Sequence, residues 1–146
     1  MMKTIEIKTI NRSSFGKYGT VIELAGNDGS GRYFEVIEET RSTGWRIGMM
    51  TINRNVAPYL ERHLKSKEIH EPVHGTMILI VAQGDEPQNP EAFLLDKPVS
   101  VHERIWHQVM AISDTATVKV TENSDMPSSE SETWKLPNGI TSKIIL

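Results

Sequence analysis

The sequence of 146 residues contains no cysteine. Disulfide bonds, thiolate metal sites and cysteine nucleophiles are therefore excluded, and nothing favours a secreted scaffold held together by disulfides. The glycine-rich phosphate-binding loops of nucleotide-binding proteins and the GxSxG turn of serine hydrolases are also missing. Nucleotide binding and serine-based hydrolysis therefore lose their usual support.

A basic cluster is absent as well, because 16 Lys and Arg residues are set against 19 Asp and Glu residues, for a net charge of -3. Nucleic acid and anionic membranes are therefore not expected as partners. No apolar run approaches the roughly 18 residues that span a bilayer. The first residues, MMKTIEIKTI, lack the apolar core of a signal peptide, so a cytoplasmic protein is the expectation.

Short apolar runs separated by turn sequences dominate what is present. Hydrophobic residues make up 38% of the chain and charged residues 24%, and the length suits one domain over residues 1–146. Runs and turns that alternate about every ten residues predict an all-β sandwich or closed barrel. The predicted strands cover 4–10, 20–24, 32–39, 45–52, 76–83, 92–96, 99–112, 116–123 and 139–146.

Three segments between these strands do not have a strand pattern. VAPYLERHL, residues 56–64, is the one segment with a helical pattern, and it predicts a short helix. AGNDGSGR, residues 25–32, predicts a hairpin turn or a mobile loop, because its glycines tolerate positive φ. NSDMPSSESE, residues 123–132, is polar and predicts a flexible loop.

The stretch ERHLKSKEIHEPVHG, residues 61–75, holds three of the five histidines and three glutamates. If 68–74 is extended, alternation places Glu68, His70 and His74 on one face, with His63 just upstream. Imidazoles and a carboxylate on one face could bind a divalent metal ion or act as general acid and base. The structural alternative is a solvated, charged turn at the surface.

A second histidine stretch, HERIWHQ, follows about forty residues later in the chain. In an extended strand, His107 shares a side with Val109, on an apolar face that is expected to point inward, whereas His102 and Trp106 point the other way. A buried histidine needs a hydrogen-bond partner or a ligand. A core histidine satisfied by a backbone carbonyl is the alternative.

One arginine is a candidate for binding a substrate carboxylate. Arg54 ends the stretch TINR after an apolar run. Its guanidinium could hold a carboxylate through a bidentate pair, or it could make an ion pair at the surface.

An ordered series of stretches resembles the ureidoglycolate lyase (ureidoglycolate hydrolase) family, a branch of the cupin superfamily. The series is FGKYGTVIE at 15–23, TINRN at 51–55, LERH at 60–63, EPVHG at 71–75, ILIVAQGDEP at 78–87, EAFLL at 91–95 and VHERIWHQVM at 101–110. The resemblance covers residues 18–123, in the order and near the spacing of the family.

The resemblance implies a single cupin-like domain, a double-stranded β-helix or jelly-roll barrel that forms a homodimer and has its pocket inside the barrel. Members of the family cleave ureidoglycolate to glyoxylate and urea during salvage of purine-derived nitrogen. A lyase acting on this small hydroxy acid, or on a related compound, is the implied function. A small-molecule substrate is thus the expected partner.

The resemblance also implies roles for particular residues. The histidine of the family's ERH stretch corresponds to His63, the tryptophan–histidine pair corresponds to Trp106 and His107, and Glu68 stands where members often carry glutamine. Catalytic roles are expected for His63, Glu68 and His107, and substrate binding for Arg54 and Trp106.

Other members of the cupin superfamily bind a metal through histidine and glutamate residues at similar places. The implied ligand set is therefore His63, Glu68, His70 and His107, around one divalent ion (nickel, zinc, manganese or iron). The chain departs from the family at Gln108, which replaces a second histidine, and at His70, where an aromatic residue is frequent. It also departs in residues 26–45, which lack the family's usual segment before the INR motif, and in the tail.

Two other functions remain open at this point. Cupin scaffolds carry many activities, so a non-catalytic cupin that binds a sugar or another small metabolite is the alternative. A dimeric structural domain is the third possibility, in which the histidines are satisfied core or surface residues that point in different directions.

Overall fold

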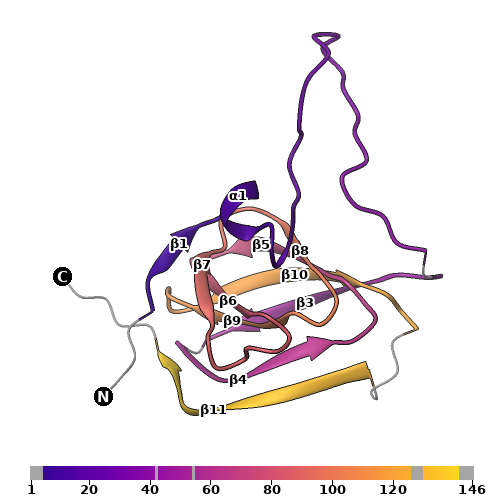
Figure 1. Ribbon diagram of the computed structural model, residues 1–146. Helices are drawn as coiled ribbons and strands as arrows, with labels where there is room; N and C mark the ends of the chain where they lie inside the picture. Colours follow the sequence, from indigo (N-terminus) through magenta and orange to yellow (C-terminus); the bar gives the residue numbers. More distant parts are fainter. Residues whose placement is uncertain (1–4, 42, 54, 126–129, 142–146) are drawn as a thin grey trace.

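The computed structural model describes residues 5–41, 43–53, 55–125 and 130–141, and in this part the strands form two sheets (Figure 1). The six-stranded sheet has the order β1 (Ile7–Thr9), β7 (Glu91–Leu94), β6 (Met77–Ala82), β9 (Trp106–Ala111), β4 (Val56–His63), β11 (Ser131–Thr141). The five-stranded sheet has the order β2 (Gly19–Val21), β8 (Val99–Val101), β5 (Glu68–His74), β10 (Ala116–Glu122), β3 (Arg46–Ile52).

The chain crosses repeatedly from one sheet to the other. Strands β4, β6, β7, β9 and β11 lie in the six-stranded sheet, whereas β5, β8 and β10, which come between them in the chain, lie in the five-stranded sheet. Nearly all pairs are antiparallel, and the exception is β1 beside β7. The all-β, jelly-roll fold expected from the sequence is therefore confirmed.

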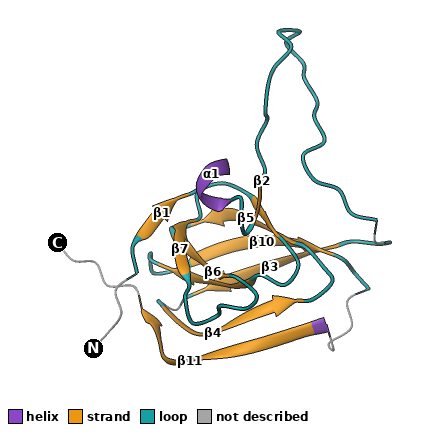
Figure 2. Cartoon of the chain, in the orientation of Figure 1, coloured by secondary structure: helices purple, strands orange, loops and turns teal. Residues whose placement is uncertain are grey.

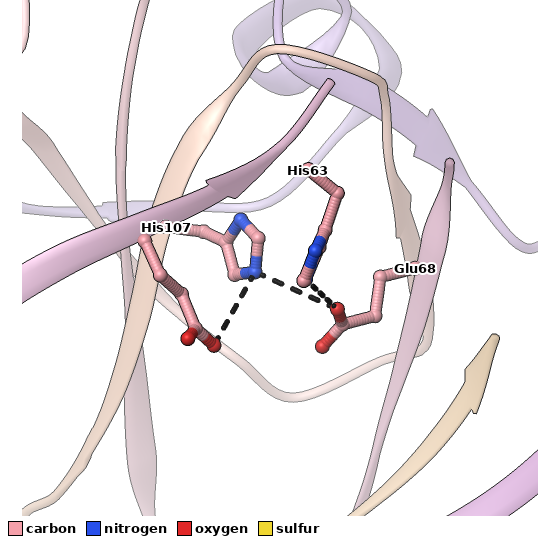
Figure 3. A group of neighbouring side chains, drawn as sticks. His63, Glu68 and His107 are labelled. Carbon is pink, nitrogen blue, oxygen red and sulfur yellow. Dashed lines mark ion pairs between the residues drawn. The ribbon is translucent and has the colours of Figure 1, made fainter. Parts of the chain in front are cut away.

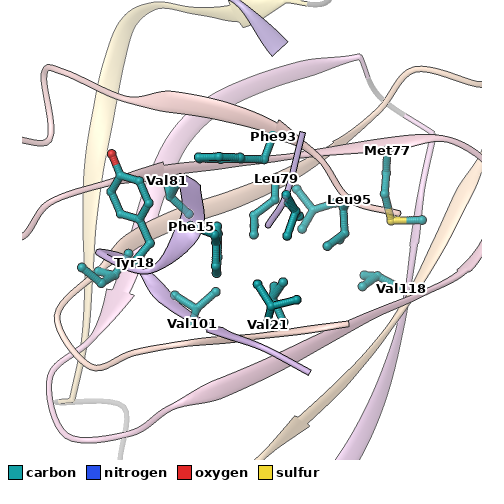
Figure 4. Packing of buried hydrophobic residues seen from close by; sticks show 14 of the residues in the cluster. Phe15, Tyr18, Val21, Met77, Leu79, Val81, Phe93, Leu95, Val101 and Val118 are labelled. Carbon is teal, nitrogen blue, oxygen red and sulfur yellow. The ribbon is translucent and has the colours of Figure 1, made fainter. Parts of the chain in front are cut away.

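The main core fills the space between the sheets, at the end where β2 and β8 lie (Figure 4). The ring of Phe15 packs edge-on against Phe93, with 5.4 Å between ring centroids. Strand β6 supplies Met77, Leu79 and Val81 to this core. Its alternate residues enter a second apolar cluster, and this explains why the run TMILIVAQ is apolar throughout.

The second cluster covers the outer face of the six-stranded sheet. Its fully or nearly buried members are Ala57, Leu60, Ile78, Ile80, Ala82, Ala92, Trp106 and Met110. Partly buried side chains from near both chain ends, Ile5, Leu136 and Ile140, pack against it. Both faces of this sheet are thus covered, whereas the part of the inner face of the five-stranded sheet that lies beyond the main core lines a cavity.

The helix predicted for residues 56–64 is wrong, because this segment forms strand β4. Its buried residues Ala57, Leu60 and His63 lie three apart, which resembles a helical pattern. Ala57 and Leu60 both belong to the second cluster, on either side of an irregular register with β11 between Lys135 and Ile140, whereas His63 lines the cavity on the other face of the sheet. Such an irregularity breaks the strict alternation of side chains in a strand.

Three further predictions are corrected. Residues 32–39 form no strand; they belong to a long two-limbed loop between β2 and β3 that rises away from the sheets (Figures 1 and 2). The predicted strand 99–112 is interrupted by a turn in which Arg104 has φ of 67° and its amide donates to the carbonyl of His63. The loop expected at 123–132 is shortened at its end, because β11 begins at Ser131, and residues 126–129 of it lie outside the described residues.

The structure also contains one short helix that the sequence reading missed, α1 (Arg12–Phe15). A reciprocal cap starts it: the side chain of Asn11 accepts from the amide of Ser14, and the Ser14 hydroxyl accepts from the amide of Asn11. Within the described residues, no helix has the length and hydropathy needed to cross a bilayer. The single domain over 1–146 and the homodimer stay predictions.

A polar cluster at the edge of the main core leads to a stability prediction. Glu91 accepts hydrogen bonds from Lys8 and Tyr18 and lies 2.9 Å from Nζ of Lys17. Burial raises the pKa of Glu91, but these partners outweigh it and lower the pKa to about 2. A carboxyl with a lowered pKa stabilises the fold above its unfolded pKa of 4.5, and this contribution is lost as the pH falls toward 2.

Glu91→Gln is therefore expected to lower the free energy of unfolding by about 1–2 kcal/mol at pH 7, since both lysines are partly solvated. Urea denaturation of both proteins at pH 7 and pH 3 would measure this, and the difference between them should shrink at the lower pH. An equal difference at both pH values would contradict the assignment.

Candidate metal centre

Three strands bring histidine and glutamate side chains together between the sheets. His63 ends β4 in one sheet, and Glu68 begins β5 in the other, so the intervening crossing turns the two residues toward each other. His107 enters from β9, whose register places it opposite Glu61 of β4. Figure 3 shows the side chains of His63, Glu68 and His107 pointing toward one another.

His63 has a different partner on each ring nitrogen. Its Nδ1 lies 3.0 Å from the hydroxyl oxygen of Ser131, and its Nε2 lies 2.6 Å from Oε2 of Glu68. An imidazole lone pair and a carboxylate oxygen at that separation repel each other unless a cation, either a proton or a metal ion, is shared between them. The hydrogen bond to Glu68 accordingly raises the pKa of His63.

His107 offers a free lone pair. Its Nδ1 lies 3.0 Å from the carbonyl oxygen of Ile105, which can only accept, so Nδ1 carries the hydrogen. Its Nε2 is buried without a hydrogen bond, 3.8 Å from Oε2 of Glu68 and 3.9 Å from Oε1 of Glu61. Burial lowers the pKa of His107 to about 4, so the ring is neutral near pH 7 and its lone pair faces two carboxylates.

The pKa values of the two carboxylates in the cluster are shifted in opposite directions. Burial raises the pKa of Glu68, but hydrogen bonds from His63 and His70 outweigh it and hold that pKa well below its usual range. The pKa of Glu61 is raised, first by burial and then by the charge of Glu68. Glu68 is therefore fixed as an anion, while Glu61 is easier to protonate.

The residues fit a divalent metal ion. One ligand atom from each of Glu61, His63, Glu68 and His107 lies within 4.8 Å of the others, and three of the four residues are buried. Neutral imidazole and carboxylate are the ligands that nickel, zinc, iron and manganese take in proteins. The unpaired Nε2 of His107 is the kind of buried polar atom that a bound ion would satisfy.

His70 lies beside this group. Its Nε2 is 3.2 Å from Oε1 of Glu68, and its ring packs edge-on against His107 at 5.4 Å between centroids. These contacts orient Glu68 and His107, as residues next to metal ligands do. Of the expected ligands, the structure thus brings His63, Glu68 and His107 into one group, with His70 contacting Glu68 from the side.

Of the two residues expected to bind substrate, Trp106 does not line the cavity. Trp106 precedes His107 in β9, so it points to the opposite face, where its indole donates to the carbonyl of Gly84 and stacks on Arg62. This position on the opposite face agrees with the strand alternation, but it does not fit the substrate-binding role that the resemblance implied for Trp106. Arg54 lies outside the described residues, and its role stays a prediction.

Sequence reasoning missed Glu61. The alternation of a strand puts Glu61 and His63, two residues apart, on the same face, so the ERH stretch already carried the signal. The helix predicted for residues 56–64 obscured it. Its contact with His107 depends on the pairing of β4 with β9, which the sequence alone does not reveal.

The histidine–glutamate group lines a cavity of about 470 Å³. Beyond the group itself, the cavity is lined by residues of β3 and β10, among them Arg46, Gly48, Met50, Val120 and Glu122. A volume of this size suits a small molecule. The stretch 61–75 therefore forms part of a cavity wall, and the reading of it as a plain surface turn is not supported.

No protein-family model matches the chain. A ureidoglycolate lyase from Rhizobium etli is 25% identical, over 86% of this chain and 88% of the relative. The resemblance seen in the sequence is thus confirmed as a distant similarity over most of the chain.

Solved structures support the fold independently. A 3,4-ketoisomerase from Helicobacter canadensis aligns with a TM-score of 0.53 at 14% identity, over 77% of this chain and 86% of that one. A dTDP sugar isomerase from Desulfovibrio desulfuricans G20 aligns with a TM-score of 0.50 at 15% identity, over 82% of each chain. The fold is that of the cupins. At such low identity, the likeness to these two isomerases indicates the cupin fold and nothing finer.

A double mutant of the QdtA 3,4-ketoisomerase from Thermoanaerobacterium thermosaccharolyticum, in complex with TDP, aligns over 60% of this chain with a TM-score of 0.51 at 11% identity. This chain covers 64% of that structure, slightly less than two thirds of its length.

Proposed function

We propose that this cupin is a metal-dependent lyase that cleaves ureidoglycolate, or a closely related hydroxy acid, to glyoxylate and urea. The observation that carries the proposal is the buried group of His63, Glu68 and His107 on the wall of a cavity, with the Nε2 atom of His107 unpaired. The distant similarity to a ureidoglycolate lyase over most of the chain supports the choice of reaction.

In this proposal, His63, Glu68 and His107 hold a divalent ion. A bound ion of this kind acts as a Lewis acid and lowers the pKa of a substrate hydroxyl. Glu68 contributes a permanent negative charge, and His70 and Ser131 keep Glu68 and His63 in place through their contacts of 3.2 and 3.0 Å. The hydrogen bond to Ile105 fixes the tautomer of His107.

The reaction needs one proton to move from oxygen to nitrogen. The carbinol O–H loses its proton and becomes the carbonyl of glyoxylate; the C–N bond breaks, its electron pair stays on nitrogen, and that nitrogen takes up a proton as urea leaves. Glu61 is the member of the group that can meet a substrate, since its side chain is 39% exposed against 9% for Glu68. It would accept the hydroxyl proton and return it to the nitrogen.

The alternative, a non-catalytic cupin that binds a sugar or another metabolite, is supported by the fold alone. The isomerases that share the fold are only 14–15% identical to this chain, so they support no particular ligand.

Urea release tests the proposal. Protein stripped with a chelator would be reloaded with nickel, zinc, manganese or iron, and urea formed from ureidoglycolate would be measured against a protein-free blank. We expect release above the blank with at least one ion and none with the stripped protein. Bound metal without urea release under any of these conditions would contradict the lyase and favour a binding protein.

A further inference from the structure

Three charged residues form a row across the inner face of the five-stranded sheet. Glu122 of β10 pairs in register with Arg46 of β3 on one side and with Glu68 of β5 on the other. All three residues line the cavity that contains the metal centre. Two interstrand spacings, roughly 10 Å, separate the backbones of β5 and β3, so Arg46 lies across the cavity floor from the centre.

Arg46 and Glu122 form a pair that leaves donors and an acceptor unused. Both Nε and Nη2 of Arg46 lie 2.8 Å from Oε1 of Glu122. Within the described part of the chain, Nη1 of Arg46 and Oε2 of Glu122 have no protein partner. The Arg46 side chain is 54% exposed, so its free edge is accessible from the cavity.

The electrostatics of the cavity decide which ligand suits this pair. Among the described lining residues, Arg46 is the one Lys or Arg, against the three glutamates Glu61, Glu68 and Glu122. Arg46 is already neutralised by Glu122, and a second carboxylate beside it would face the charge of Glu122. A neutral group that offers both an acceptor and an N–H donor meets the free edge without that repulsion.

The floor beside the pair is open because position 48 has no side chain. Gly48 pairs in register with Val120, and a Cβ placed on it would meet only the carbonyl oxygen of Val120, at 4.0 Å. Its φ lies outside the left-handed region, so the backbone does not require glycine there. Position 48 therefore provides room next to Arg46.

We propose that Arg46 and Glu122 recognise a ureido or amide group of the substrate, while its hydroxy-acid end faces the metal centre. The free edge of Arg46 donates to the ureido carbonyl, and Oε2 of Glu122 accepts from a ureido N–H. This inference rests on the proposed function, and it makes the ion pair the feature that distinguishes ureido acids from plain hydroxy acids.

Calorimetric binding of two probes to the metal-loaded protein tests the proposal. N-Carbamoylglycine carries the ureido group, and glycolate carries only the hydroxy acid. We expect Arg46→Gln and Glu122→Gln each to lower the affinity for N-carbamoylglycine about 10- to 100-fold, which is the range for a hydrogen bond to a charged group. The affinity for glycolate should change by no more than about twofold. Gly48→Val should lower the affinity for the ureido probe and not for glycolate, because the valine side chain occupies the space beside Arg46.

The chain offers a matched control on the opposite face of the same sheet. Lys119 and Glu71 form a cross-strand ion pair at 2.9 Å, with both side chains partly exposed. Lys119→Gln and Glu71→Gln should leave both affinities unchanged. If Arg46→Gln lowers the affinities for glycolate and for the ureido probe equally, the proposal is overturned and Arg46 is a carboxylate site. Failure of the unaltered protein to bind N-carbamoylglycine would also overturn the proposal.

The outcome is separable from that of the proposed function. If urea release fails but the ureido probe still depends on Arg46 and Glu122, the recognition site stands without the lyase. If urea is released and both variants bind the ureido probe normally, the lyase stands and the recognition site is wrong.

Discussion

Replacement of His107 by glutamine is expected to abolish stoichiometric metal binding, with affinity lowered at least about 100-fold. Changes to groups that merely support a ligand cost roughly 10- to 100-fold in metal affinity, so loss of a ligand atom costs at least as much. His107 is the clearest ligand, since its tautomer is fixed by Ile105 and its Nε2 is buried and unpaired. Elemental analysis and calorimetric titration with nickel and zinc would measure the change.

His102→Gln is the matched control for this experiment. His102 lies in the turn before β9, and its Nε2 contacts the Thr20 hydroxyl at 2.9 Å, outside the metal group. The His102→Gln variant should bind metal as the unaltered protein does, and thermal unfolding would verify that both variants are folded. Full metal content in His107→Gln, or equal loss in both variants, would show that the ion is held elsewhere.

Glu68→Gln is expected to reduce urea release at least about 1,000-fold, although glutamine is frequent at this place in the family that the sequence resembles, because in this chain His70 stands beside the carboxylate in place of the family's frequent aromatic residue. The change is nearly isosteric, but it removes the charge that faces His63, His70 and His107 and one carboxylate ligand. Loss of both the ligand and the anion affects every step that depends on the bound ion. Glu71→Gln, on the outward face of the same strand and paired with Lys119, should retain full activity.

The same variant has a spectroscopic consequence in metal-free protein. The hydrogen bond that His63 donates to Glu68 is the main cause that raises the pKa of His63. Glu68→Gln should therefore lower the His63 pKa, which an NMR titration of its ring protons would measure. Unchanged activity together with an unchanged His63 titration would remove Glu68 from the centre.

Much of the sheet structure could be predicted because it depends on local pattern. The apolar run at 76–83 contains β6 and the segment 116–123 contains β10, and the extended conformation considered for 68–74 is found as β5. The segment 56–64 was misread because its buried residues lie three apart, although Ala57 and Leu60 pack in the second cluster and His63 faces the cavity on the other side of the sheet. Residues 32–39 carry a strand-like pattern, but no strand of the described residues pairs with them.

The candidate site was predictable where residue type and alternation were sufficient. His63, Glu68 and His107 were selected from the sequence, and the structure places them in one group. Arg46 and Glu122 were missed because their meeting depends on the register between β3 and β10, which are seventy residues or so apart in the chain. Pairing of this kind is non-local, and residue patterns within one segment do not encode it.

The most direct test of the metal centre is anomalous diffraction from crystals of the metal-loaded protein, recorded at the absorption edge of the ion that elemental analysis identifies. The expected result is one strong peak within roughly 2.0–2.2 Å of Nε2 of His63, Nε2 of His107 and a carboxylate oxygen of Glu68. A stoichiometric ion bound at any other place, or no peak after loading with each of the four metals, would contradict a metal-dependent cupin.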